Sequence, residues 1–181
     1  RIGEALGPLS PGIHWYSQDG TMVLVGTNLT GDATPYAPFG QDMDLALIPV
    51  AGGEPVRVAL DRRRWSIEGV VAQDDRALLQ PGPTAFRLRG RDKQTGEAVI
   101  LTADWGTGRV TETWRGRGRF QDIQAAGPNR LVATYEDFRT PANLFTFSGD
   151  LANAARLTDV SPEQRRAAAG EAELFDTVIP R

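Results

Sequence analysis

Short apolar runs separated by Gly, Pro and Asp recur along the chain, a pattern that predicts β-strands joined by tight turns. In the first unit, two such runs flank Asp19-Gly20, a dipeptide that tolerates the positive φ of a hairpin turn. Two further runs flank Gly52-Gly53 in the same way, after a long insertion from 28 to 40 that contains Gly and Pro. The strands expected in this unit lie at 13–16, at 22–25, at 45–50 and from 56 onward.

Two further units follow the same plan. The second is expected to hold strands at 67–72, 77–79, 86–88 and 98–101. The third is expected to hold strands at 120–125, 131–134, 143–147 and 155–157. In the second unit we place the first turn at Asp74-Asp75 and the last at Thr95-Gly96. Residues 105–114 have no place in this scheme, although Gly106-Thr107-Gly108 is typical of another hairpin turn.

The second and third units also end alike, with Val-Ile-Leu-Thr-Ala-Asp at 99–104 and Ala-Arg-Leu-Thr-Asp at 155–159. The first turns of the three units fall at Gly20, Asp75 and Pro128, a spacing of 55 residues and then 53. Four strands in roughly 40–50 residues, plus insertions, is the period of a propeller blade. The pattern therefore predicts an all-β fold, a partial β-propeller of about three four-stranded blades. The blades are expected at about 12–60, 65–115 and 119–160.

Residues 161–181 have a different pattern, which predicts a short helix followed by an outgoing strand. Ser161 can cap the helix, Pro162 suits its first position and Gln164 can reach back as in a capping box. Gly170 can end it, and the strand is expected at 177–179. Three blades cannot close a ring, because propellers typically have about four to eight. We therefore expect open apolar blade faces, and a chain that is part of a longer polypeptide.

The composition fits a globular protein with many turns. Of 181 residues, 40% are hydrophobic and 24% charged, with 20 Gly and 12 Pro. The formal net charge of −3 gives no overall attraction to nucleic acid or to an anionic membrane. No apolar stretch approaches the roughly 20 residues that span a bilayer, and the absence of Cys is compatible with the cytosol. We expect a cytoplasmic protein with no nucleic acid and no membrane as partners.

Several stretches resemble the β-propeller of the prolyl oligopeptidase family of serine peptidases, closest to its acylaminoacyl-peptidase branch. The strongest matches are Thr-Pro-Ala-Asn-Leu-Phe at 140–145, Ala-Arg-Leu-Thr-Asp at 155–159 and Glu-Ala-Glu-Leu-Phe at 171–175. The stretch at 15–20 is similar to the family's Trp-Ser-Pro-Asp-Gly turn, with Tyr16 inserted and Gln18 in place of Pro. The resemblance covers most of the chain, and the final blade is followed by a helix and strand as in that family.

The resemblance implies a propeller that covers an α/β-hydrolase domain and admits short peptides. The Ser-Asp-His triad would lie outside this chain, after Arg181. The partners implied are the remaining blades and the hydrolase domain of the same protein, and short peptide substrates; homo-oligomerisation is compatible with the sequence. The competing interpretation is a Tol-type periplasmic propeller without catalytic activity, which serves as a protein-binding scaffold.

The chain's own residues do not form a catalytic motif. No serine stands in the Gly-x-Ser-x-Gly sequence of a nucleophile elbow; the serines are Ser10, Ser17, Ser66, Ser148 and Ser161. The single His, His14, lies in an expected strand beside Trp15, and we interpret it as structural. We expect no catalytic residue, no cofactor-binding residue, no metal ligand and no cofactor in this chain.

Two acidic pairs have alternative interpretations. In the dipeptidyl-peptidase branch of the family, acidic residues on the propeller bind the free amine of the substrate. Glu136-Asp137 follows an expected strand, but we interpret it as a solvated loop pair, which favours oligopeptidase or acylaminoacyl activity. Asp42 and Asp44 resemble the start of a calcium loop but lack its further ligands, so we expect a polar loop that enters a strand.

The basic and aromatic clusters are expected to be structural. Arg-Gly-Arg-Gly-Arg at 115–119 resembles a nucleic-acid-binding segment, but such segments lie in strongly basic, disordered chains. We expect these arginines, and those at 62–64, at a blade rim; an Arg that holds a peptide carboxylate is the alternative. The tryptophans are expected in the cores between blades: Trp15, Trp65, Trp105 and Trp114.

Overall fold

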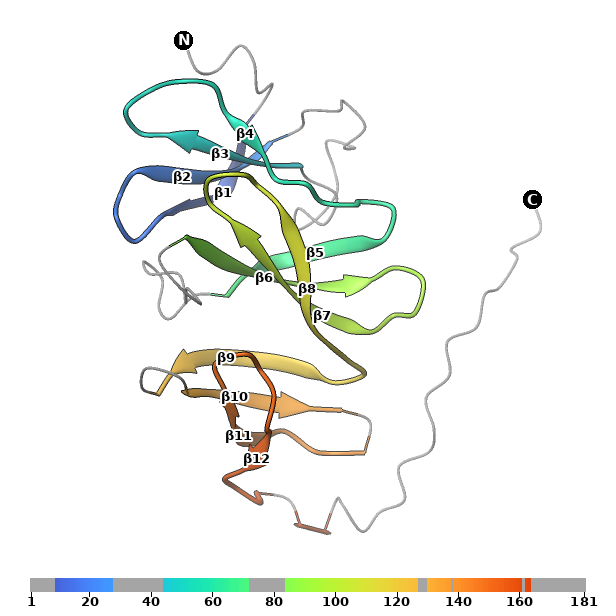
Figure 1. Cartoon of the computed structure of the whole chain (residues 1–181). Helices are drawn as coiled ribbons and strands as arrows, with labels where there is room; N and C mark the ends of the chain where they lie inside the picture. The colour runs from blue at the N-terminus through green and yellow to red at the C-terminus, as the bar shows by residue number, and fades with distance from the viewer. Residues whose placement is uncertain are drawn as a thin grey trace, which may run out of the picture.

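The chain forms three four-stranded antiparallel sheets, which lie one after another like blades (Figure 1). The computed structural model describes residues 9–27, 44–71, 84–126, 130–137, 139–160 and 162–163, without the side chains of 9–14, 27 and 125. In every sheet each strand pairs with the next one along the chain. The predicted all-β fold and the partial propeller of about three four-stranded blades are therefore confirmed.

The strands divide evenly among the three blades. The first blade holds β1 (Leu9–Tyr16), β2 (Met22–Thr27), β3 (Asp44–Pro49) and β4 (Val56–Arg57). The second holds β5 (Trp65–Val70), β6 (Ala85–Asp92), β7 (Ala98–Asp104) and β8 (Val110–Gly116). The third holds β9 (Arg119–Ala125), β10 (Arg130–Glu136), β11 (Asn143–Ser148) and β12 (Ala155–Arg156).

The predicted order of strands in the second blade was wrong. The run at 86–88 belongs to the second strand, β6, which pairs with β5, and the run at 98–101 belongs to the third strand, β7. The fourth strand is β8, which begins in the stretch at 105–114 that had no assigned place and ends at Gly116. The expected strand at 77–79 and the turn at Asp74-Asp75 lie outside the described residues.

The two similar endings are consequently not equivalent in the structure. Leu101 and Thr102 lie on β7, a third strand with a neighbour on each side. Leu157 and Thr158 follow β12, the fourth and outermost strand of its sheet. A short apolar run before Thr is compatible with either position, because local pattern does not encode a strand's place in a sheet.

Two hydrophobic cores hold the three blades together. Val99, Leu101 and Ala103 of β7 face the first core, whereas Ile100 faces the second, so this strand is buried on both sides. The first core joins blades one and two: Leu24, Leu45, Leu47, Val58, Ile67, Phe86, Leu88, Val99, Leu101, Ala103 and Trp105. The second core joins blades two and three: Val71, Ile100, Phe120, Ile123, Leu131, Ala133, Phe147 and Leu151.

The outward face of the third blade differs from the apolar blade face that was expected. Leu131 and Ala133 of β10 point to the second core, so the alternating residues Val132, Thr134 and Glu136 point away from it. The Glu136 carboxylate on this face accepts a hydrogen bond from the Gln121 side chain at 2.8 Å. This face is therefore largely polar.

Most of the expected C-terminal helix and strand lies outside the described residues. Of that segment, Pro162 and Glu163 are described, and their backbone is helical. Within the described part of the chain, the structure contains no helix that is both long and apolar enough to cross a membrane.

Successive antiparallel strands place alternate connections at opposite ends of the blades. One end carries the connections at 58–64, 93–97, 117–118 and 137–142 (Figure 1, right). By the same alternation, the end of β12 also belongs to this end of its blade. Charged residues are concentrated in these connections, so we call this the charged end. The other end carries the turns at 17–21, 50–55, 105–109 and 149–154.

Candidate functional site at the charged end

Arg115 is the centre of an ion-pair network at the charged end of the second blade. Its guanidinium donates to Asp92 Oδ2 at 2.7 Å, to both carboxylate oxygens of Glu112 at 2.8 Å and to Glu97 Oε2 at 2.9 Å. A fifth hydrogen bond reaches Thr95 Oγ1 at 3.2 Å. These hydrogen bonds raise the pKa of Arg115 above its ordinary value, and those to Glu112 contribute most. The Arg115 side chain is thus fully occupied and is not free to bind a ligand.

Asp92 connects this network to the β6–β7 hairpin. Its side chain is buried, Oδ1 accepts hydrogen bonds from the N–H of Gln94 and Thr95, and Oδ2 accepts from Arg115. Burial acts to raise the pKa of Asp92, but these hydrogen bonds outweigh it and hold that pKa well below its usual value. Hydrogen bonds from Arg115 also lower the pKa of Glu97. All these carboxylates are therefore ionised near neutral pH, and none of them is poised as a general acid.

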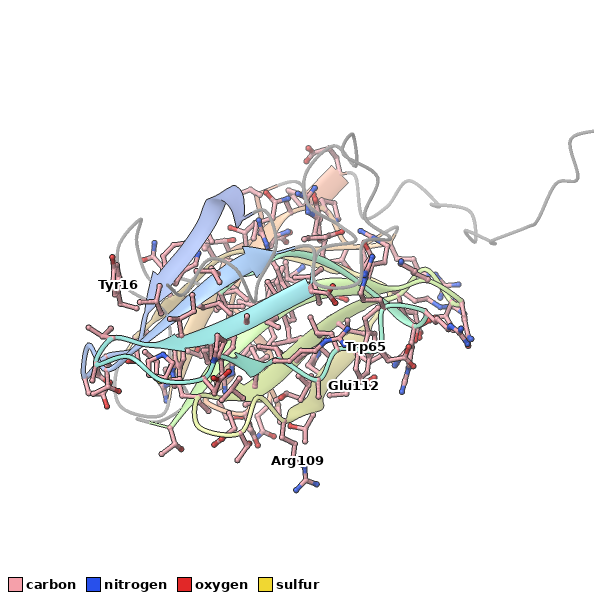
Figure 2. The ribbon with its side chains drawn as sticks, turned by 90° about the horizontal axis from the view of Figure 1, so that it is seen from above. Tyr16, Trp65, Arg109 and Glu112 are labelled. Atoms are coloured by element: carbon pink, nitrogen blue, oxygen red, sulfur yellow. The ribbon has the colours of Figure 1, made fainter. Side chains whose placement is uncertain are left out.

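Arg64 extends the network to the start of β5. It donates to Glu112 at 3.0 Å and contacts Asp92 at 3.4 Å, while its guanidinium lies 4.9 Å from the centre of the Trp65 ring. Figure 2 shows Trp65 and Glu112 close together, away from Tyr16 and Arg109. Because the carboxylates and arginines come from two strands and two connections, the network fixes this end of the blade.

The Arg-Gly-Arg-Gly-Arg stretch has a structural explanation. Gly118 is buried, and a Cβ built on it would lie 2.3 Å from the Tyr135 ring. A Cβ on Gly116 would lie 2.6 Å from the Trp114 ring. The glycines are thus required where aromatic rings approach the backbone, and Arg115 is required by the network. This agrees with arginines at a blade rim.

The other two arginines of the stretch remain accessible. Arg117 and Arg119 are exposed, and within the described residues neither makes a side-chain hydrogen bond or ion pair. Glu97 lies near enough to Arg117 for this positive charge to help lower the Glu97 pKa. An anionic group could therefore approach Arg117 and Arg119, but not Arg115.

Asp44 forms ion pairs with two arginines of the described residues, Arg57 and Arg62. It is buried at the start of β3, where Arg57 donates to it at 2.9 Å and Arg62 contacts it at 3.4 Å. Asp42 lies outside the described residues. Across the described ranges, no three His, Cys, Asp or Glu side chains come together as a metal site would require.

The acidic pair at the end of β10 binds neighbouring protein groups. The Glu136 carboxylate accepts from Gln121, as described above, and Asp137 accepts from the N–H of Arg139 at 2.8 Å and of Thr140 at 2.6 Å. The Tyr135 hydroxyl donates to Asp137 at 3.2 Å. Asp137 therefore organises the β10–β11 connection.

The other residues singled out in the sequence also have local roles. Ser17 and Ser148 hydrogen-bond to the turn residues Asp19 and Asp150. His14 lies on β1 opposite Val25, and its side chain is outside the described residues. Ser10 has no described side chain, and Ser161 is not described.

The tryptophans belong to the cores, as expected. Trp105 packs on Phe86 with ring centres 4.4 Å apart, and Trp114 packs on Phe120 at the same distance. Trp15 and Trp65 are partly buried against the first core.

The sequence-based interpretation missed the Arg115 network. One available signal was the repeated Asp-x-x-Thr-Gly, at 92–96 and again at 104–108. In both turns the Asp Oδ1 accepts hydrogen bonds from the N–H groups two and three residues later. The Gly of each turn has positive φ, 72° at Gly96 and 66° at Gly108. The motif therefore marks a hairpin end with a fixed carboxylate, but it does not show which arginine that carboxylate meets.

Comparison with solved structures supports the propeller architecture. The putative TolB from Agrobacterium tumefaciens superposes with a TM-score of 0.52 and 19% identity, over 88% of this chain and 50% of that chain. The isopeptidase AtxE2, solved as a serine-to-alanine variant with Astexin3-dC4 bound, superposes with a TM-score of 0.54 and 15% identity. That match covers 87% of this chain and 22% of the isopeptidase chain.

These similarities define the class of the fold, a β-propeller-like protein of four-stranded blades. At identities below 20% they show the fold alone. No family model matches the chain. No curated protein matches it either. The chain spans about half the length of the TolB structure and about a fifth of the isopeptidase.

Proposed function

We propose that this chain is the propeller portion of a serine peptidase of the prolyl oligopeptidase family, of acylaminoacyl-peptidase or oligopeptidase type. The observation that carries the proposal is its fold similarity to an isopeptidase chain of which it covers 22%, solved with Astexin3-dC4 bound. The motifs at 140–145 and 155–159, which lie on or beside β11 and β12, add the family resemblance.

In this proposal the chain gates access to the active site and contributes no reacting group. The triad of the parent protein would perform acyl transfer from the peptide carbonyl to Ser, with His as base and Asp orienting the His. The propeller would admit short, unstructured peptides and exclude folded proteins. In agreement with this role, the titratable groups of the Arg115 network are held in fixed ion pairs.

A fluorophosphonate probe tests the proposal directly. The parent polypeptide should be labelled, and short peptides should compete with the label. A folded protein that contains the same peptide sequence should not compete. This chain alone should be neither labelled nor active on peptides. Hydrolysis by the isolated chain would contradict the proposed division of roles, and a parent protein that resists labelling would contradict the peptidase assignment.

The second candidate is a non-catalytic propeller that binds other proteins, as a Tol-type scaffold. The TolB superposition supports it, since this chain spans 50% of that structure but 22% of the isopeptidase chain. The residues that follow Arg181 in the parent polypeptide discriminate between the two candidates. A Gly-x-Ser-x-Gly within the following domain supports the peptidase, whereas an early stop supports the scaffold.

A further inference from the structure

Three arginines form a row on the face of β6 that packs against the third blade. Phe86 and Leu88 of this strand belong to the first core, so the residues that alternate with them point to the opposite face. These residues are Arg87, Arg89 and Arg91. We call them the arginine row. It brings three positive charges to the boundary between the second and third blades.

The two outer arginines of the row each have protein partners. Arg87 is buried and donates a hydrogen bond to the Gly149 carbonyl of the third blade. Burial lowers the pKa of Arg87, and the negative charge of Asp150 partly offsets this effect. Arg91 donates to Glu68 Oε1 at 3.3 Å. One carboxylate therefore balances the charge at each end of the row.

The middle arginine has no such partner. Arg89 is partly buried, and its side chain makes no hydrogen bond or ion pair within the part of the chain that the structure describes. Its Nε and the Nε of Arg87 are both buried and lack a hydrogen-bond acceptor. The residues directly opposite Arg89 on the neighbouring strands are Gly69 and Ile100, which carry no polar side-chain group. The row thus holds one positive charge more than its described carboxylates balance.

An unbalanced guanidinium at this position is costly unless something else satisfies it. Its N–H groups lose hydrogen bonds to water on burial, and its charge is repelled by the arginines on either side. Buried polar groups in native proteins nearly always have a partner, which is a protein group, a water or an ion. Water would satisfy the N–H groups of Arg89 and Arg87 but would leave the excess charge. An anion would satisfy both.

We propose that Arg87 and Arg89 bind a small oxyanion, a carboxylate or a phosphate group, at the boundary between the second and third blades. Alternate residues of a strand are about 7 Å apart, so both guanidinium groups can reach one oxyanion. The planar fork of N–H donors matches either group. Because Arg87 also holds the Gly149 carbonyl, the bound anion should strengthen the packing of the two blades. This site is separate from the Arg115 network, and it does not depend on which of the two candidate functions holds.

Titration of the full chain with sodium acetate and with sodium phosphate tests the site. The ionic strength is kept constant with chloride, and the arginine Nε–H signals are followed by nuclear magnetic resonance. The signals of Arg87 and Arg89 should shift together and saturate at one midpoint, and the melting temperature should rise with occupancy. The signal of the exposed Arg109 should change little and without saturation. The anion with the lower midpoint identifies the class of ligand.

Variants of Arg89 show whether the fork binds the anion. Arg89→Gln should weaken binding about tenfold or more and remove the rise in melting temperature, because it removes the charge and most of the donors. Arg89→Lys keeps the charge but loses the fork, so it should weaken binding less. Arg109→Gln is the control and should leave binding unchanged. Without added anion, Arg89→Gln should fold at least as stably as the unmutated chain, because it removes an unpaired charge.

Two outcomes would overturn the proposal. If all arginine signals drift alike without saturation, the anions act only by screening charge. If binding saturates but survives in Arg89→Gln, the anion lies elsewhere on the chain. The first outcome is decided on the unmutated chain, so it stands whatever the variants do.

Discussion

At the residue scale, several residues that resemble ligand-binding motifs in the sequence serve packing instead. Gly118 lies between Arg117 and Arg119, yet its role is to leave room for the Tyr135 ring. A local pattern such as Arg-Gly-Arg cannot reveal this, because the ring that requires the glycine comes from β10, the second strand after it. The residues that are free to meet a ligand are recognised only after the paired ones are known.

Gly118→Ala should destabilise the chain by about 1–3 kcal/mol, because the added methyl must displace a ring packed in the second core. Gly106→Ala is the matched control: the nearest atom to its Cβ is 3.6 Å away, so its effect should stay within about 0.5 kcal/mol. Urea unfolding of both variants measures the difference. Equal free energies of unfolding would show that the ring moves aside at no cost.

Tyr135 should make the stability depend on alkaline pH. Burial, together with the charge of Asp137 and the hydrogen bond to it, raises the pKa of Tyr135 to about 12 from an ordinary value of 10.0. Because the pKa of Tyr135 is higher in the folded state than in the unfolded state, its contribution to the free energy of unfolding is complete below about pH 10. This contribution is lost as the pH rises from about 10 to about 12.

Tyr135→Phe should therefore flatten the decline in the free energy of unfolding between about pH 10 and pH 12. Tyr16→Phe is the control, since Tyr16 is 58% exposed. Denaturant unfolding at a series of pH values measures both. An unchanged slope in Tyr135→Phe would mean that another group causes the alkaline loss.

At the element scale, the strand order of the third blade could be predicted from the sequence, but that of the second could not. In the third blade the turns differ from one another, so each apolar run has one place. In the second blade β7 has the same Asp-x-x-Thr-Gly turn at both ends, at 92–96 and 104–108. A turn motif fixes a hairpin but does not say which two strands of the sheet it joins.

The Arg115 network could not be predicted because its members are brought together by strand pairing. Asp92 and Glu97 lie 23 and 18 positions from Arg115 in the sequence. Only the pairing of β7 with β6 on one side and β8 on the other places these residues at one end of the sheet. The contact between Asn143 and Thr158 is similar, since it crosses the β11–β12 hairpin.

The two turns with the shared Asp-x-x-Thr-Gly motif offer a matched test of the network. Asp92→Asn keeps an oxygen for the turn but removes the charge that Arg115 and Arg64 contact, and it should cost on the order of 3 kcal/mol. Asp104→Asn alters the equivalent turn, whose aspartate contacts backbone N–H groups and Thr107, and it should cost about 1 kcal/mol or less.

The difference between these variants should depend on pH. The pKa of Asp92 is lowered on folding, so its stabilisation is present above the unfolded value near 3.8 and is lost as the pH falls below it. The gap between Asp92→Asn and Asp104→Asn should therefore be widest near neutral pH and narrow in acid. Thermal unfolding from pH 7 down to pH 3 measures it; a constant gap would remove charge as its cause.

At the scale of the whole molecule, the second blade is the central support of the arc. Its strand β7 contributes to both hydrophobic cores, with Leu101 in the first and Ile100 in the second. Blades one and three therefore depend on opposite faces of the same strand. A truncated side chain on β7 should therefore destabilise the outer blade that packs against the same face of the strand.

Leu101→Ala and Ile100→Ala test this arrangement with neighbouring residues of one strand. Both side chains are almost fully buried, so each truncation should cost about 2–5 kcal/mol. Native-state hydrogen exchange should show faster opening of β2 and β3 in Leu101→Ala, and of β10 and β11 in Ile100→Ala, because partial unfolding follows the weakened core. The outer blade on the other face of β7 should keep the protection from exchange that it has in the unmutated chain. If both variants accelerate exchange equally in all three blades, the arc unfolds as one cooperative unit, and the two cores are not independently stable.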